Sequence, residues 1–208
     1  MGQSPCVQLR VDKEFPELRM IATAVTMLER GGVIAYPTDT NYGFGCGIFD
    51  KQAIDRIYQI RNLNPDHLLS FLVPDLSDIA RYALIENDAY RIMKRYLPGP
   101  YTFILRATPE VPRIFQSKRK TVGIRVPNHP VTLALARTYG KPIVSTSTKI
   151  GEQMLYNPDD IVEKAGKGID LILDSGPLSG ADSSVIDLSG PYPVVLREGA
   201  GDVRWVAV

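Results

Sequence analysis

Apolar side chains recur at the spacing of an α-helix in residues 17–30. The residues that set this period are Leu18, Ile21, Val25 and Leu28. Gly31-Gly32 follows at once and supplies a stop, because glycine readily adopts the left-handed conformation that ends helices. The next run, "VIAYP", is short and apolar, which indicates a buried strand.

The rest of the chain continues to interleave the two patterns. Asp50 is a suitable cap for a helix in which Ile54, Ile57 and Tyr58 face inward. Pro130 marks the first position of a helix at 130–139, and "NPDDIVEKAGKG" combines an Asn cap, an early Pro and acids in the first turn. Other helices are expected around 75–82 and 86–96. Strands are expected at "LLSFLV", "YTFILRA", "TVGIRV", "KPIVSTS", "IDLILD", "SVIDLS" and "PVVLRE". Helices and strands alternate early and strands dominate late, which predicts one mixed α/β sheet with flanking helices.

Composition narrows the class of protein but does not select a function. The 208 residues are 44% apolar and 23% charged, with a formal net charge of +1, so no overall field requires a nucleic-acid partner. Residues 1–20 do not read as a signal peptide, and no apolar run is long enough for a membrane span. The two cysteines have no metal-binding spacing and are expected to be reduced. A cytoplasmic protein is expected.

The stretch "AYPTDTNYGFGCG" places glycines at alternate positions between a predicted strand and a predicted helix. Glycine-rich turns in that context often hold phosphates. The Walker pattern is absent, however, and the dinucleotide pattern fails, since Ile48 stands where its sixth residue should be glycine. These glycines are therefore expected to serve turns and close backbone approach.

Hydroxyl-rich strand ends alternate with isolated arginines. "PTDT", "VSTST" and "DSSVID" are the hydroxyl clusters, and the arginines are Arg61, Arg125 and Arg197. Guanidinium groups bind carboxylates and phosphates through two parallel hydrogen bonds, and hydroxyls help to orient such ligands. The pattern suggests an anion site, although the sequence leaves open whether these groups share one pocket.

Several segments together carry a family resemblance. "GGVIAYPTDTNYGFG", "PGPYTFIL", "TVGIRVPNHP", "PIVSTS", "SSVIDLSG" and "VVLREG" occur in the order typical of the YrdC-like family, the threonylcarbamoyl-AMP synthases. The match runs from about Leu18 to Val203, and "QIRNLNPDHL" and "REGAGDV" look most like the YciO branch. The resemblance implies a single domain over residues 1–208 without the extra C-terminal domain of longer members. It also implies a twisted mixed sheet with a concave, positively charged face.

The resemblance further implies a reaction that joins L-threonine, bicarbonate and ATP into threonylcarbamoyl-AMP, toward modification of adenosine 37 in tRNA. Mg²⁺ would accompany the ATP, and no metal bound by the protein itself is expected. The residues carried over to the threonine site are Thr40, Arg125, Ser145 and Ser184. Those carried over to the ATP site are Arg61, His67, Thr121, Ser147, Lys149 and Arg197.

The family pattern is broken at three positions. Leu63 stands where the family places an arginine that binds ATP phosphates, and Lys149 replaces an asparagine. Leu72 replaces an expected histidine. The residues expected to bind threonine therefore match the family pattern better than those expected to bind the nucleotide.

Two other functions stay open at this point. The run "RIFQSKRKTVGIR" gathers Lys118, Arg119 and Lys120 with two further arginines, as expected of a module that binds tRNA or double-stranded RNA. Carbamoyl- or acyl-adenylate chemistry on a different small substrate is the third possibility.

Overall fold

The computed structural model describes residues 5–64, 67, 69–77, 79–112 and 120–206. The helices are α1 (Leu18–Glu29), α2 (Lys51–Arg61), α3 (Ile79–Tyr82), α4 (Asn87–Tyr96), α5 (Pro130–Tyr139) and α6 (Pro158–Ala165). The strands of the first half are β1 (Val7–Arg10), β2 (Ile34–Tyr36), β3 (Gly43–Gly47), β4 (Ser70–Leu72), β5 (Ala83–Leu84) and β6 (Tyr101–Ala107). Those of the second half are β7 (Thr121–Arg125), β8 (Ile143–Ser147), β9 (Lys149–Ile150), β10 (Gln153–Met154), β11 (Leu171–Asp174), β12 (Ser184–Asp187) and β13 (Val194–Arg197). A 3₁₀ turn at Arg204–Val206 follows.

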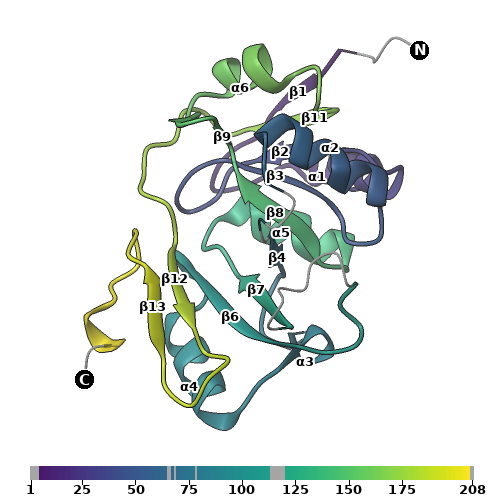
Figure 1. Cartoon of the computed structure of the whole chain (residues 1–208). Coiled ribbons are helices and arrows are strands. Elements are labelled where there is room, and N and C mark those ends of the chain that lie inside the picture. The colour runs from purple at the N-terminus through teal and green to yellow at the C-terminus, as the bar shows by residue number, and fades with distance from the viewer. Residues whose placement is uncertain (1–4, 65–66, 68, 78, 113–119, 207–208) are drawn as a thin grey trace.

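One large sheet organises the described part of the chain. Its eleven strands run in the order β1-β11-β2-β3-β8-β4-β7-β6-β12-β13, with β5 paired to β6, while β9 and β10 form a separate hairpin. The sheet contains both parallel and antiparallel pairs, so the predicted mixed α/β architecture is confirmed. The sheet is strongly twisted from its β1 end to its β13 end (Figure 1).

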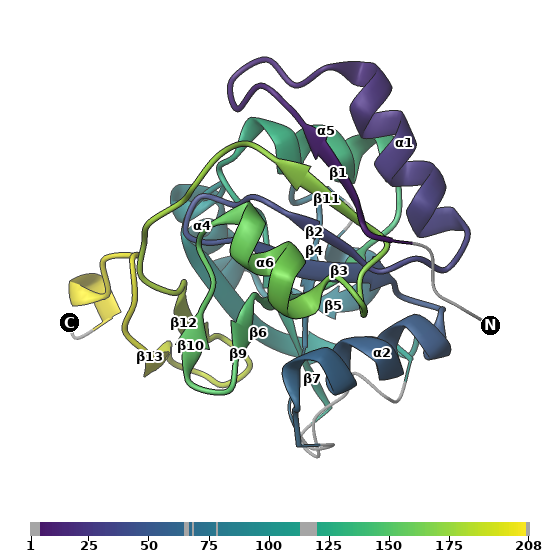
Figure 2. The ribbon, with the colours of Figure 1, turned by 90° about the horizontal axis from the view of Figure 1, so that it is seen from above.

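The helices form layers on both faces of the sheet (Figure 2). Helices α1 and α5 pack on one face, over β11, β2, β8 and β4, where Ile21, Leu28, Leu135, Ile143 and Leu173 form one apolar cluster. Helices α2, α3, α4 and α6 pack on the other face, over a larger cluster. Because α1 and α5 cover only the β1 half of their face, the same face stays open over the other half.

Local signals placed most helices correctly. The Asp50 carboxylate accepts a hydrogen bond from the Ala53 N–H at 2.9 Å and caps α2, and Asn157 caps α6. Pro130 opens α5 as predicted. Helix α1 forms where its period predicted, with Ile21, Val25 and Leu28 buried, whereas Leu18 in its first turn is 78% exposed. The helix predicted at 75–82 is only α3, a single turn ending at Tyr82.

The glycine-rich stretch was expected to be a loop, and that prediction was wrong. Gly43–Gly47 is a fully buried strand, β3, which forms a hairpin with β2 and pairs on its other side with β8. The ring of Tyr36 lies across the glycines of β3, and its hydroxyl donates to the Ser145 hydroxyl on β8 at 2.6 Å. The alternating glycines leave room for this ring.

Gly45 is the glycine of β3 at which an added Cβ would meet the most close neighbours. A Cβ there would lie 2.7 Å from Ile143 Cγ2, 2.8 Å from Tyr36 Cε1 and 2.8 Å from the Val144 carbonyl oxygen. We expect Gly45→Ala to lower the free energy of unfolding by about 1–3 kcal/mol, since overpacking a tight core forces neighbours to move. Urea unfolding measures the change. Gly190→Ala is the matched control, because a Cβ at that position meets nothing within 4 Å; equal midpoints for the two variants would contradict the prediction.

Candidate functional site

A cavity of about 540 Å³ opens on the part of the sheet that α1 and α5 leave uncovered. It is lined from seven strands of the sheet, from the end of α2, from β9 and from the loops at 38–41 and 182–183. Its charged and hydroxyl-bearing lining residues are Thr38, Arg61, His67, Ser70, Thr102, Arg125, Ser145, Thr146, Ser147, Lys149, Asp182, Ser183 and Arg197. The structure thus brings the three isolated arginines of the sequence into one pocket.

Small side chains form the floor of the pocket. Ser145, Ser70 and Gly123 are direct cross-strand partners on β8, β4 and β7, so they share one face of the sheet. A Cβ at Gly123 would lie 3.3 Å from both Ile104 Cδ1 and Thr102 Cγ2. Short side chains, two of them with hydroxyl groups, therefore cover this part of the sheet. They leave space for a ligand between the longer side chains at the rim of the pocket.

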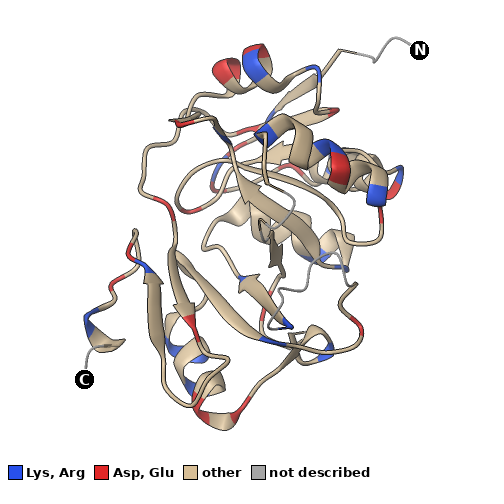
Figure 3. Cartoon of the chain, viewed as in Figure 1, with Lys and Arg blue, Asp and Glu red and all other residues tan. Residues whose placement is uncertain are grey.

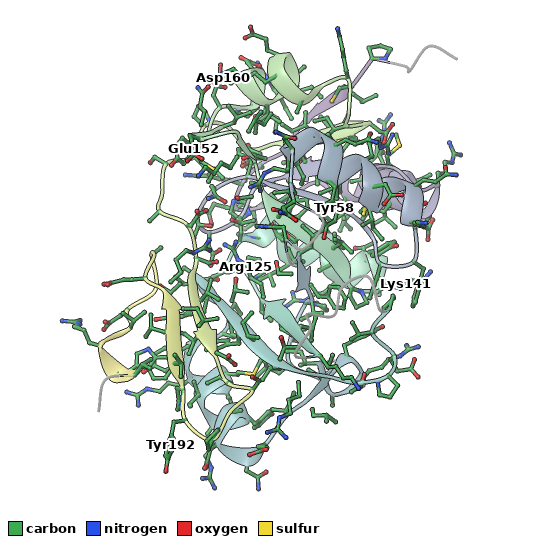
Figure 4. All side chains as sticks on the ribbon, viewed as in Figure 1. Tyr58, Arg125, Lys141, Glu152, Asp160 and Tyr192 are labelled. Carbon is green, nitrogen blue, oxygen red and sulfur yellow. The ribbon has the colours of Figure 1, made fainter. Side chains whose placement is uncertain are left out.

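Arg125 is held in place by the turn that precedes β3. Its Nη2 donates to Asp39 Oδ1 at 2.7 Å, to Thr40 Oγ1 at 2.7 Å and to Thr38 Oγ1 at 3.1 Å. The Arg125 and Asp39 side chains are each 10% exposed. Nε of Arg125 is buried and has no hydrogen-bond partner among the described residues. The guanidinium, at the centre of the molecule in Figure 4, is thus rigidly oriented by the turn.

The turn itself is internally bonded. The Thr38 hydroxyl donates to the Asn41 carbonyl at 2.6 Å, and the Asn128 N–H donates to Asp39 Oδ2 at 3.0 Å. Thr132 of α5 bonds to the Pro37 carbonyl. The stretch "PTDTNYG" therefore forms a wall of the pocket, with Thr38, Asn41 and Gly43 facing the cavity. It does not present the row of free N–H groups that a phosphate loop requires.

Arg61 enters the pocket from the last turn of α2. Its Nη1 donates to the Thr146 hydroxyl at 2.6 Å and to Ser147, at the end of β8. Burial lowers the pKa of Arg61, while the nearby Asp182 carboxylate raises it. The Nε of Arg61 is buried without a partner among the described residues. A guanidinium at the pocket edge with an unused donor can take an anionic ligand.

Arg197 stands at the opposite edge, on β13. Its Nε and Nη2 both donate to the Ser183 carbonyl, at 3.0 and 2.8 Å, and its Nη1 lies 3.7 Å from Asp182 Oδ2. Ser183 also shares a hydrogen bond of 2.9 Å with the Thr102 hydroxyl on the floor. The arginine is therefore fixed by the backbone of the segment leading into β12.

Two further basic groups complete the rim. Lys149, on β9, forms an ion pair of 3.0 Å with Glu152, a residue that is 98% exposed. His67 lies at the rim, and its pKa is lowered by partial burial and by the charges of Arg61 and Arg197. Blue and red segments are interspersed along the ribbon (Figure 3), whereas the charged residues of the cavity lining are mostly basic.

Not all of the sequence-predicted residues reach the cavity. Thr40 is buried behind the wall, where it holds Arg125. Thr121 lies on the pocket side of β7 by register but outside the cavity lining. Leu63, at the position of the missing arginine, packs against the larger apolar cluster. Lys118 and Arg119 lie outside the described residues, while Lys120 is exposed just before β7.

Ser184 lies on the opposite face of the sheet, so its predicted contact with threonine does not agree with its position. Its hydroxyl donates to the Gly201 carbonyl at 2.6 Å and accepts from the Gly199 N–H at 2.9 Å. The neighbouring Ser183 lines the pocket instead. Side chains alternate between the faces of a strand, and the register of β12 against β6 decides which of the two serines faces in.

Seven polar residues of the lining were not singled out by sequence reasoning: Thr38, Asn41, Ser70, Thr102, Thr146, Asp182 and Ser183. The only signal for them was their position inside the quoted segments. Nothing local distinguishes the lining residues there from their neighbours. Among the described residues, no group of three or more His, Cys, Asp or Glu side chains could hold a metal ion. In the same part of the chain, Cys6 and Cys46 are both free, and no helix is long and apolar enough to cross a membrane.

Comparison with known proteins agrees with the motifs. A family model for Sua5, YciO and YrdC proteins, described as telomere recombination, matches residues 26–199. The uncharacterized protein YciO of Escherichia coli K12 is 45% identical over 197 residues, or 93% of this chain and 96% of that protein. The crystal structure of E. coli YciO superposes with a TM-score of 0.92 at 41% identity, over 97% of this chain and 99% of the other.

Relatives with a named activity are more distant. The threonylcarbamoyl-AMP synthase of Pyrococcus abyssi is 31% identical over 182 residues, which are 86% of this chain but 54% of that enzyme. The structure of P. abyssi Sua5 complexed with L-threonine superposes with a TM-score of 0.86 at 30% identity, over 94% of this chain and 58% of that one. The family resemblance inferred from the motifs is confirmed.

The position of His67 gives a test of the pocket as an anion site. Its pKa is lowered below 6.5 in the folded protein, so its protonation opposes folding as the pH falls through that value. The negative charge of a bound polyanion would raise the pKa of His67 and so oppose the lowering caused by the two arginines. We therefore expect the NMR-titrated pKa of His67 to lie below 6.5 in the free protein and to rise when inorganic triphosphate is added.

His129 is the internal control for this titration. Its pKa is also lowered, mainly by burial, but it lies outside the cavity lining. A His129→Gln variant assigns the two imidazole signals. Equal responses of both histidines to triphosphate would show that the anion does not bind in the pocket.

Proposed function

Because the chain belongs to the Sua5/YciO/YrdC family, we propose that it joins L-threonine, bicarbonate and ATP into threonylcarbamoyl-AMP and pyrophosphate. The observation that carries the proposal is the single pocket in which Arg61, Arg125, Lys149 and Arg197 surround a floor of hydroxyl groups. Every substrate of this reaction carries a carboxylate, carbonate or phosphate group. A cationic rim above hydroxyl donors matches that chemistry.

In this proposal, Arg125 binds the threonine carboxylate. Its guanidinium lines the cavity, and its bonds to Asp39 and the two threonines of the turn fix its direction. Ser145 lies beside it on the floor, where its hydroxyl already accepts from Tyr36 and can donate its own proton to the substrate. The pair would hold the amino acid at the centre of the pocket.

The triphosphate would lie among the remaining basic groups. Arg61, Lys149, Arg197 and His67 stand around the rim, and Ser147 adds a hydroxyl. Mg²⁺ would arrive with the triphosphate and be ligated mainly by phosphate oxygens. Leu63 contributes to the core and not to this cation set, so Lys149 supplies charge without the two-pronged geometry of an arginine.

The chemistry needs positioning and charge neutralisation more than a reactive side chain. The threonine amine would add to bicarbonate to give a carbamate with loss of water. A carbamate oxygen would then attack the α-phosphorus, and pyrophosphate would leave. Cationic groups stabilise the negative charge that develops on the phosphate oxygens. Downstream, the adenylate would serve modification of adenosine 37 in tRNA, in the cytoplasm.

The direct test is incubation of the purified protein with ATP, L-threonine and labelled bicarbonate. The proposal expects labelled threonylcarbamoyl-AMP together with pyrophosphate, and neither product when threonine is omitted. Pyrophosphate release that depends on a different amino or hydroxy acid would indicate adenylate chemistry on another substrate. Absence of both products with every acid tried would overturn the enzyme proposal. Salt-sensitive tRNA binding would then support the RNA-binding alternative.

Arg125→Lys separates the two halves of the proposed site. Lysine keeps the charge opposite Asp39 but lacks the guanidinium fork and its Nε–H. We expect the KM for threonine to rise about tenfold or more, while the KM for ATP changes by less than about threefold. Steady-state kinetics with each substrate varied in turn gives both values.

Arg106→Lys is the matched control for that variant. Arg106 lies on β6, donates to the Ser189 carbonyl at 2.9 Å and does not line the cavity. Its replacement should leave both KM values unchanged. A rise in the KM for ATP alone in Arg125→Lys would mean that the threonine and nucleotide halves are assigned the wrong way round.

A further inference from the structure

The pocket contains one acidic side chain among the described residues that line it, Asp182. This carboxylate stands in a rim that otherwise carries three arginines and a lysine. The segment "DSSVID" begins with this residue, but the sequence singled out the hydroxyls of that segment and not its carboxylate, and the proposed reaction gives Asp182 no role. A fixed negative charge in a site for anions opposes binding, so its presence there calls for a physical explanation.

The two oxygens of Asp182 have different neighbours. Oδ1 accepts a hydrogen bond of 2.8 Å from Asn41 Nδ2, on the wall beside the Arg125 anchor. Oδ2 lies 3.7 Å from Nη1 of Arg197, which also lines the pocket. The carboxylate also raises the pKa of Arg61. One carboxylate therefore lies against Arg197 and shares the pocket lining with Arg61, two of the arginines expected to meet the triphosphate.

The backbone fixes this carboxylate at the rim. Residues 175–183 connect β11 to β12 along one side of the molecule (Figure 1). This connection is tied at Gly176, whose carbonyl accepts from the Tyr42 hydroxyl at 2.8 Å. At its far end the Asp182 carbonyl accepts from the Ala200 N–H at 2.8 Å. A Cβ at Gly180 would lie 2.5 Å from the Thr40 carbonyl oxygen, so the connection packs directly against the wall.

We propose that Asp182 is a specificity residue that limits the affinity of the pocket for polyphosphate. The inference rests on the proposed function, because it takes the cationic rim to be the triphosphate site. A triphosphate that approaches Arg197 and Arg61 meets the repulsion of Asp182 and must compete with it for the Arg197 guanidinium. The repulsion grows with the charge of the ligand, so it weakens triphosphate and pyrophosphate binding more than phosphate binding.

Asp182→Asn tests the proposal with little change in shape. The amide oxygen can still accept from Asn41, so the link to the wall is kept while the charge is lost. We expect inorganic triphosphate to bind about tenfold more tightly to the variant than to the unsubstituted protein, for one partly exposed charge near the ligand. Inorganic phosphate should gain less. Isothermal titration calorimetry at low and at high salt measures both, and the gain should shrink as salt screens the charge.

Two matched variants separate charge from structure. Glu152→Gln also removes a carboxylate paired with a basic residue of the rim, but Glu152 is 98% exposed, so triphosphate affinity should change by less than about twofold. Asn41→Ala removes the link and keeps the charge, so it should not tighten triphosphate binding. Equal tightening in Asn41→Ala and Asp182→Asn would trace the effect to a loosened connection and overturn the proposal.

The sign of the change is decisive for Asp182. If the residue only holds the connection in place, Asp182→Asn should weaken or leave unchanged the binding of triphosphate, and either result overturns the inference. Absence of triphosphate binding in both proteins does so as well. Failure of the proposed reaction is detected in a different experiment, because it appears as absence of threonylcarbamoyl-AMP when the unsubstituted protein is assayed. The triphosphate titration does not depend on that result.

Discussion

The ion pair between Arg125 and Asp39 is the contact on which the pocket depends. It joins β7 to the turn between β2 and β3, and both side chains are almost completely removed from water. A buried charge is tolerated only with a partner and further hydrogen bonds, and the hydroxyls of Thr38 and Thr40 supply them. Loss of one partner would leave the other charge buried and would cost about 3–5 kcal/mol. The wall of the pocket and the direction of its central cation are therefore set together.

The rest of the site depends on which side chains of the sheet face the same way and on which part of that face the helices cover. Residues that face each other across neighbouring strands share a face, so Gly123, Ser70 and Ser145 form one continuous floor. On that same face, α1 and α5 bury the apolar side chains of β2, β4, β8 and β11. The face changes from apolar to polar where the helices end. The cavity is thus the uncovered part of a face that is otherwise core.

The basic rim differs from the floor in how firmly its groups are held. Arg61 and Arg197 are tied to Ser147 and Ser183 through backbone carbonyls, whereas Lys149 is paired with an exposed glutamate on a short hairpin. An exposed ion pair contributes little and is easily exchanged. Lys149 can therefore turn toward a ligand at small cost. Leu63 packs in the core instead, so the nucleotide half of the site relies on point charges and on arginines that are already partly bonded.

Much of the fold follows from local patterns in the sequence. Local signals place the helices correctly, because each signal acts within a few residues. These signals are the apolar period of α1, the caps Asp50 and Asn157, and the proline that opens α5. The apolar runs at β6, β7 and β8 identify buried strands in the same way. The motifs also identify Arg61, Arg125, Ser145 and Arg197 as pocket residues, since each lies in a distinctive polar segment beside a strand.

Only the tertiary structure decided the remaining features, because they depend on partners far away in the sequence. The three glycines of Gly43–Gly47 disfavour a strand, and the segment is a strand because it pairs with β2 and β8, where its glycines leave space for the Tyr36 ring. The polar strand β1 exists through its pairing with β11. Ser183 faces the pocket and Ser184 does not, because the pairing of β12 with β6 fixes which alternate residues face in. Asn41 and Asp182 meet across the rim although 141 positions separate them. No pattern within a single segment encodes such contacts, since they form only when strand pairing brings distant segments together.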